Sequence, residues 1–90
     1  MTKIYIYCLF DETDPEQFKG VYSSIKAAHR DALKLSNRGD SKVYMFDADG
    51  NTINPTLVGL RNCFKGKCDV TVKYRTNRSI VTIFKTRLKE

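Results

Sequence analysis

The sequence lacks tryptophan, and its 90 residues include one histidine and three cysteines. A structural zinc site needs four ligands, most often Cys and His. His29 is the one histidine available beside Cys8, Cys63 and Cys68, so we expect no metal and no other cofactor. An odd number of cysteines in a chain of cytosolic character also favours buried free thiols over disulfides.

The sequence has no long hydrophobic run either. A membrane-spanning helix needs about 18 or more consecutive apolar residues, and no stretch of the chain supplies them. The first residues, Met1-Thr2-Lys3, lead into alternating residues rather than into the continuous apolar segment of a signal peptide. We therefore expect a cytoplasmic protein with no membrane partner.

The motifs of common enzymes are missing as well. The chain contains no G-x-S-x-G, no H-E-x-x-H, no P-loop and no Cys–His pair at motif spacing. We interpret His29 as a residue at the boundary between the apolar and basic sides of a helix. The run from Asp47 to Asn51 differs from a calcium loop, which has Gly at its sixth and Glu at its twelfth position; here Gly50 is fourth and Val58 twelfth. We expect a turn at this run and no enzyme activity.

What the sequence does have is an excess of positive charge. It holds 16 Lys and Arg against 10 Asp and Glu, for a formal net charge of +6. Residues 61–90 carry nine of the basic residues and two acidic ones, whereas acidic residues cluster at 11–16. A basic surface attracts polyanions, so the charge favours nucleic acid or another acidic partner. The alternative is that these side chains only keep the surface soluble.

The clearest element is a helix predicted over residues 23–39. Its apolar positions recur at spacings of three and four, which places them on one stripe; they are Ile25, Ala28, Ala32 and Leu35. Its basic positions recur every four residues and form a ridge on another side; they are Lys26, Arg30 and Lys34. We expect the stripe to pack against a sheet, and Gly39 to end the helix.

Alternating patterns predict strands around this helix. They cover residues 3–10, 17–22 and 42–47, with a short strand at 52–53 and a hairpin over 70–88. Asn54 and Pro55 favour the start of a second helix, with Leu57, Leu60 and Phe64 on its buried side. Residues 1–90 are therefore predicted to form a single α+β domain, β-β-α-β-(β)-α-β-β, with two helices on one face of a mainly antiparallel sheet.

The hairpin register follows if Asn77-Arg78 is a two-residue loop. One face then carries the pairs Tyr74/Val81, Val72/Ile83 and Val70/Lys85, and belongs on the helices. The other face carries Arg75/Ile80, Lys73/Thr82 and Thr71/Phe84, and should meet solvent. A one-residue slip would expose Tyr74 and Val72, so the alternative register is costly.

The solvent face has the chemistry of a platform for single strands, because cations hold phosphates and an aromatic ring stacks on a base. The predicted contact residues are Lys73, Arg75, Arg78, Thr82 and Phe84, with the helix ridge of Lys26, Arg30 and Lys34 as a second candidate surface. We expect RNA rather than DNA, because the sequence has an aromatic platform and no helix-turn-helix pattern.

Two other interpretations stay open. Lys and Thr on the wet face of a sheet also serve solubility and discourage edge pairing. A basic surface can equally dock on an acidic host protein, such as a polymerase, a defence nuclease or a toxin, and inhibit it without catalysis. The sequence leaves the oligomeric state open.

The run from Phe18 to Ala28 follows a strand that ends in acidic residues, and joins "GVYSS" to an Ala-rich helix. This arrangement is similar to that of small accessory proteins of tailed phages, particularly of the T-even type, over about residues 3–45. The resemblance implies a host-takeover or anti-defence factor that binds a host protein or nucleic acid in the host cytoplasm, rarely an enzyme. The basic segment 61–90 lies outside this resemblance.

Overall fold

The computed structural model describes residues 4–36, 42–77 and 79–88. The elements follow the predicted order of two strands, a helix, two strands, a helix and two strands. They are β1 (Tyr5–Asp11), β2 (Phe18–Tyr22), α1 (Ile25–Ser36), β3 (Tyr44–Phe46), β4 (Thr52–Ile53), α2 (Leu57–Phe64), β5 (Val70–Arg75) and β6 (Ile80–Arg87). The α+β prediction is confirmed.

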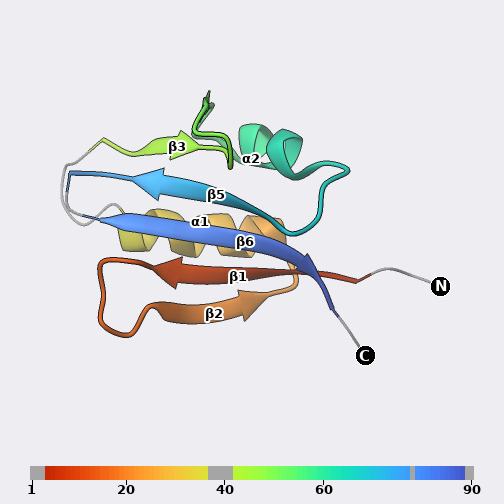
Figure 1. The fold of residues 1–90 in the computed structure, drawn as a ribbon, viewed down its shortest axis with the longest axis horizontal. Helices are drawn as coiled ribbons and strands as arrows, with labels where there is room; N and C mark the ends of the chain where they lie inside the picture. The colour runs from red at the N-terminus through yellow and green to blue at the C-terminus, as the bar shows by residue number, and fades with distance from the viewer. Residues whose placement is uncertain (1–3, 37–41, 78, 89–90) are drawn as a thin grey trace.

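The strands form one six-stranded sheet in the order β2-β1-β6-β5-β3-β4. Each neighbouring pair is antiparallel. Helix α1 lies behind the sheet in Figure 1 and contacts β1, β2, β5 and β6. Helix α2 contacts α1, β4 and β5, so one face of the sheet packs on the helices. Neither helix within the described ranges has the length and apolar character needed to cross a membrane.

The core lies between this face and the helices. Leu9, Ile83 and Val72 are neighbours in register across β1, β6 and β5, and all are fully buried. Lys85 lies two residues after Ile83 on β6, so its side chain points to the same face, and it is also buried. Its Nζ donates to the carbonyl oxygen of Phe64 over 2.8 Å, which gives the buried ammonium group a partner.

The predicted stripe of α1 is confirmed at its centre. Ala28 and Ala32 have no exposed surface, whereas Ile25 and Leu35 are partly buried against the core. The prediction that His29 is a boundary residue is wrong, because its side chain is buried, with 8% exposed. The predicted end of this helix at Gly39 lies outside the described residues.

The predicted start of α2 is also corrected. Thr56, rather than Asn54, caps the helix, and its Oγ1 accepts a hydrogen bond from the Gly59 amide over 3.1 Å. The reason lies in the preceding turn, where the carbonyl oxygen of Asn54 accepts from the Thr56 amide. That turn presses against the first turn of the helix, so the chain becomes helical only at Leu57. Leu60 and Phe64 are buried.

The pairing of β1 with β2 contains an irregularity. Leu9 pairs with Gly20 and Phe10 with Phe18, so Lys19 is left without a register partner. The extra residue lies beside Gly20, and a glycine inside a strand often marks such a bulge.

The predicted turn after β3 is confirmed. The amides of Asp49 and Asn51 both donate to Asp47 Oδ1, over 3.0 and 2.8 Å. Gly50 adopts φ +85°, a conformation that glycine tolerates without strain. This carboxylate oxygen therefore stabilises the turn.

Candidate nucleic-acid interface

The face of the sheet away from the helices carries one row of side chains across every strand. Directly paired residues on antiparallel strands point to the same face. Register partners run from β2 to β4, and we call the set the crossing row: Phe18, Phe10, Thr82, Lys73, Phe46 and Thr52. The crossing row therefore combines three aromatic rings, one cation and two hydroxyl groups.

The predicted register of the β5–β6 hairpin is confirmed in full, with Lys73 paired to Thr82, Thr71 to Phe84 and Arg75 to Ile80. Each of these pairs lies on the helix-free face. The structure therefore brings Lys73, Arg75, Thr82 and Phe84 together on one surface, as the sequence predicts. Arg78 lies outside the described residues.

Thr82 corrects one detail of that prediction. It lies on the expected face, but only 6% of the residue is exposed, and its Oγ1 lacks a hydrogen-bond partner among the described residues. Its position on β6, between β1 and β5, accounts for the burial, because the neighbouring side chains cover it. Phe84 is half-buried. Thr82 thus forms the floor of the surface.

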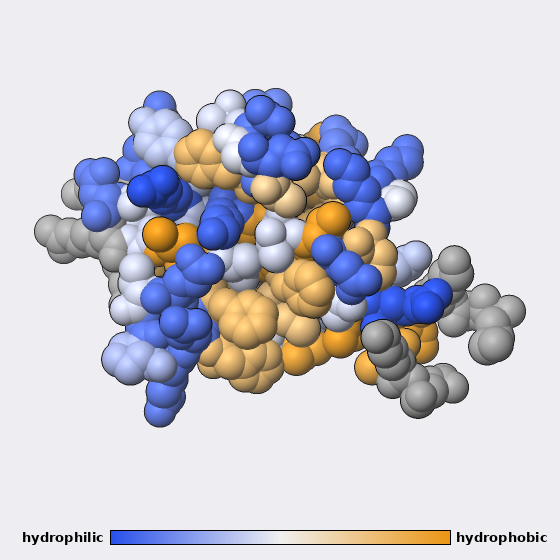
Figure 2. Space-filling model, in the orientation of Figure 1, coloured by the Kyte–Doolittle hydropathy of each residue, from blue (hydrophilic) through white to orange (hydrophobic). Residues whose placement is uncertain are grey.

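An apolar area occupies the β1–β2 side of this face. Phe10 and Phe18 make an edge-to-face contact with ring centroids 5.7 Å apart. Phe18 is 57% exposed and Val21 is 53% exposed. Figure 2 shows this apolar surface in orange over β1 and β2, with hydrophilic side chains around it. Exposed rings of this kind offer flat surfaces for stacking.

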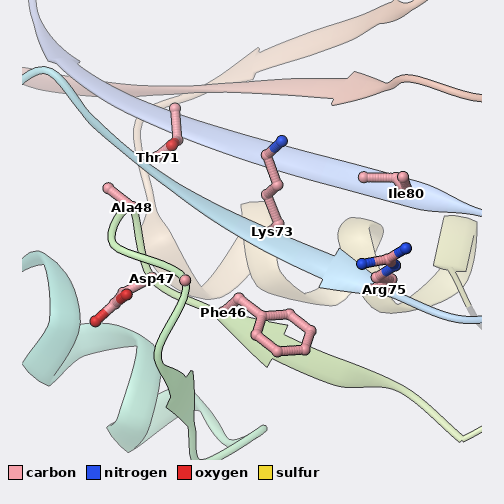
Figure 3. A pocket seen from close by; sticks show the side chains of 8 residues that line it. Phe46, Asp47, Ala48, Thr71, Lys73, Arg75 and Ile80 are labelled. Carbon is pink, nitrogen blue, oxygen red and sulfur yellow. The ribbon is translucent and has the colours of Figure 1, made fainter.

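A hollow of about 390 Å³ occupies the β3–β5 side of the same face. Side chains from three strands and the turn after β3 line it; they are Phe46, Asp47, Ala48, Gly50, Thr71, Lys73, Arg75 and Ile80. In Figure 3 the Phe46 ring lies between the Asp47 turn and Arg75, and the Asp47 carboxylate points away from Lys73 and Arg75. The hollow thus combines a ring with two cations.

The Lys73 cation has an acidic neighbour. Its Nζ lies 3.9 Å from Oε1 of Glu12, in the loop that joins β1 to β2, and both side chains are well exposed. An exposed ion pair of this length contributes at most about 1 kcal/mol. A phosphate can therefore displace Glu12 from Lys73 at small cost.

The basic ridge of α1 lies on the opposite side of the sheet. Lys26, Arg30 and Lys34 are exposed on the helix, and Asp31 lies among them. Tyr22 donates a hydrogen bond to Asp31 over 2.6 Å. This bond lowers the pKa of Asp31 and raises the pKa of Tyr22 to about 12. An ionised carboxylate therefore lies among the three cations of the ridge. The ridge and Lys73 lie on different faces of the molecule.

The three cysteines lie on different parts of the fold and do not form one site. Cys8 lies on the helix-free face beside Phe84, Cys63 on α2 and Cys68 before β5, and all three are free. The prediction that the thiols are buried is wrong, because Cys8 and Cys63 are half-buried and Cys68 is exposed. Burial, followed by the negative charge of Asp47, raises the pKa of the Cys63 thiol. Within the described ranges no three His, Cys, Asp or Glu side chains converge in a way that could hold a metal ion.

Sequence reasoning missed the three rings of the crossing row. The alternation in residues 42–47 already separates Phe46 from Met45, and that in β1 separates Phe10 from Leu9. The pattern contains no information on which strands are neighbours, so it cannot place either ring beside Lys73.

No family model, curated protein or solved structure matches this chain. Its function must therefore be argued from the chemistry of its own surface.

Proposed function

We propose that the helix-free face binds single-stranded nucleic acid, with RNA preferred over DNA. The observation that carries the proposal is the crossing row, in which Lys73 lies between the rings of Phe10 and Phe18 toward one edge of the sheet and the ring of Phe46 toward the other, all on one face. Cations that hold phosphates and rings that stack on bases are the two components of single-strand platforms. Arg75 adds a second cation on the same face. The preference for RNA follows from this platform chemistry and from the lack of a helix-turn-helix pattern in the sequence.

A second candidate is a protein inhibitor that docks on an acidic host target. The exposed apolar area at Phe18 and Val21 favours it, because such areas also mark protein contacts. The similarity of residues 3–45 to phage accessory proteins suggests that either activity serves host takeover in the host cytoplasm. Competition separates the candidates, because a protein that acts only as an inhibitor does not bind RNA, so RNA should not displace its partner.

The test is the salt dependence of binding to a labelled single-stranded RNA, measured by fluorescence anisotropy. Lys73→Ala and Arg75→Ala should each weaken binding and flatten the slope of log K against log salt by about one, because each removes one phosphate contact. Phe84→Ala should cost about 1–3 kcal/mol of stacking and leave the slope nearly unchanged. Thermal unfolding checks that each variant is folded.

The Glu12→Gln variant tests the same contact from its acidic side, and it should change the affinity in the opposite direction. It removes the carboxylate that competes for Lys73, so binding should tighten, by up to about fivefold if the pair is worth about 1 kcal/mol. Glu16→Gln, an exposed position in the same loop, changes the net charge equally and serves as the control. If the parent binds neither RNA nor DNA at low salt, the proposal fails and the acidic protein partner becomes the leading account.

A further inference from the structure

We propose that the hollow beside Phe46 holds one base of the bound strand, so that the nucleic acid runs across the β-strands along the crossing row. This inference rests on the proposed function and adds a pocket and a direction to it. The two ends of the crossing row differ in character. The β1–β2 end is exposed and apolar, whereas the β3 end is hollowed and basic.

The lining of the hollow suits a nucleotide. Its volume of about 390 Å³ falls in the range of small-molecule sites, about 300–1,000 Å³. Phe46 provides an aromatic surface on which a base can stack, and Lys73 and Arg75 provide positive charge for the attached phosphate. Ile80 adds an apolar wall, and the Thr71 hydroxyl offers a polar contact.

The one acidic side chain that lines the hollow does not oppose a phosphate there. Asp47 Oδ1 accepts two amide hydrogen bonds from its own turn. The carboxylate points away from Lys73 and Arg75 in Figure 3. The charge beside Phe46 is therefore mainly positive.

The spacing of the two ends sets a length for the strand. Phe10 on β1 and Phe46 on β3 are separated by β6 and β5, which is three strand spacings, or about 14 Å at about 4.8 Å each. Stacked nucleotides rise about 3.4 Å, so about four to five nucleotides reach from one ring to the other. Lys73 lies between the two ends, where the backbone of such a strand would pass.

The experiment measures the affinity of oligouridines of two to eight nucleotides for the parent, Phe46→Leu and Phe10→Leu. Leucine keeps an apolar side chain at each position and removes the ring. With the hexamer, each substitution should weaken binding about 5- to 150-fold, and the double variant should lose the product of the two factors. Parent affinity should rise steeply up to about five nucleotides and slowly thereafter. Val58→Ala, at a 65% exposed position on α2, is the control and should bind like the parent.

A hexamer with 2-aminopurine at successive positions locates the pocket directly. One position should show fluorescence quenching that Phe46→Leu abolishes and Phe10→Leu retains. If the parent binds the hexamer but Phe46→Leu binds it equally well, the pocket is wrong and the proposed function stands. If uridine monophosphate binds as tightly as the hexamer, the crossing path is wrong. If the parent binds no oligonucleotide at low salt, the proposed function fails and this inference fails with it.

Discussion

The side chain of His29 connects α1 to the sheet. Its Nδ1 lies 2.6 Å from the Tyr74 hydroxyl, in a buried contact between α1 and β5. Burial lowers the pKa of His29 and raises the pKa of Tyr74. The pair therefore joins the main helix to the strand that carries Lys73 and Arg75, and it does so with a neutral imidazole.

This contact predicts a loss of stability in mild acid. Because the pKa of His29 is lower in the folded than in the unfolded chain, the unfolded chain takes up the proton first, and stability falls as the pH drops below about 6.5. Urea unfolding at pH 7.5 and pH 5.5 measures the difference. The His29→Gln variant should lose less stability between these two pH values than the parent. Equal losses in parent and variant would contradict the assignment.

At the scale of elements, the start of α2 depends on the close approach of Asn54 to Gly59 rather than on helix propensity. A Cβ at Gly59 would collide with the backbone carbonyl oxygen of Asn54, and would lie 3.0 Å from that residue's side chain. Backbone atoms in a tight turn cannot easily move aside. Gly59 therefore allows the turn before the helix to pack against its first residues, although glycine is a poor helix former.

Gly59→Ala should consequently destabilise the protein. In an exposed helix interior the same change would stabilise it by about 1 kcal/mol, whereas crowding of this kind costs about 1–3 kcal/mol. Chemical denaturation gives the free energy of unfolding. The matched control is Val58→Ala, one residue away and exposed, where the change should stay within about 0.5 kcal/mol. A Gly59→Ala variant that is more stable than the parent would show that the turn at Asn54 can move aside to accept the methyl group.

At the scale of the whole molecule, the sheet separates two basic surfaces. Lys73 and Arg75 lie on the helix-free face, and the ridge of α1 lies on the other side. A short single strand that lies along the crossing row cannot also reach α1. The ridge can still raise the local concentration of a polyanion by long-range attraction, which salt screens.

This arrangement predicts that the ridge makes no phosphate contact with a short strand. The triple variant Lys26→Gln, Arg30→Gln and Lys34→Gln should leave the salt slope for a hexanucleotide unchanged within about half a unit, because it releases no additional counterions. Lys73→Gln with Arg75→Gln should lower the same slope by about two. Anisotropy titrations at several salt concentrations measure both. If the slope of the ridge variant fell by about three, the phosphate contacts would lie on α1 and not on the sheet.

Local patterns in the sequence were sufficient for the order of the elements and for the hairpin register. Side-chain alternation, helical spacing and turn residues act over a few positions, so the β5–β6 pairs and the buried Ala28 and Ala32 follow from them. The face that holds Lys73, Arg75 and Phe84 was predictable for the same reason.

Only the tertiary structure determined which strands and which side chains lie next to one another. The strand order brings Phe10 and Phe46 into the row of Lys73, and packing places Tyr74 against His29. It also sets the approach of Asn54 to Gly59 that delays the start of α2. These contacts join segments whose side chains are compatible with several arrangements, and the free energy that selects one comes from burying the whole core at once.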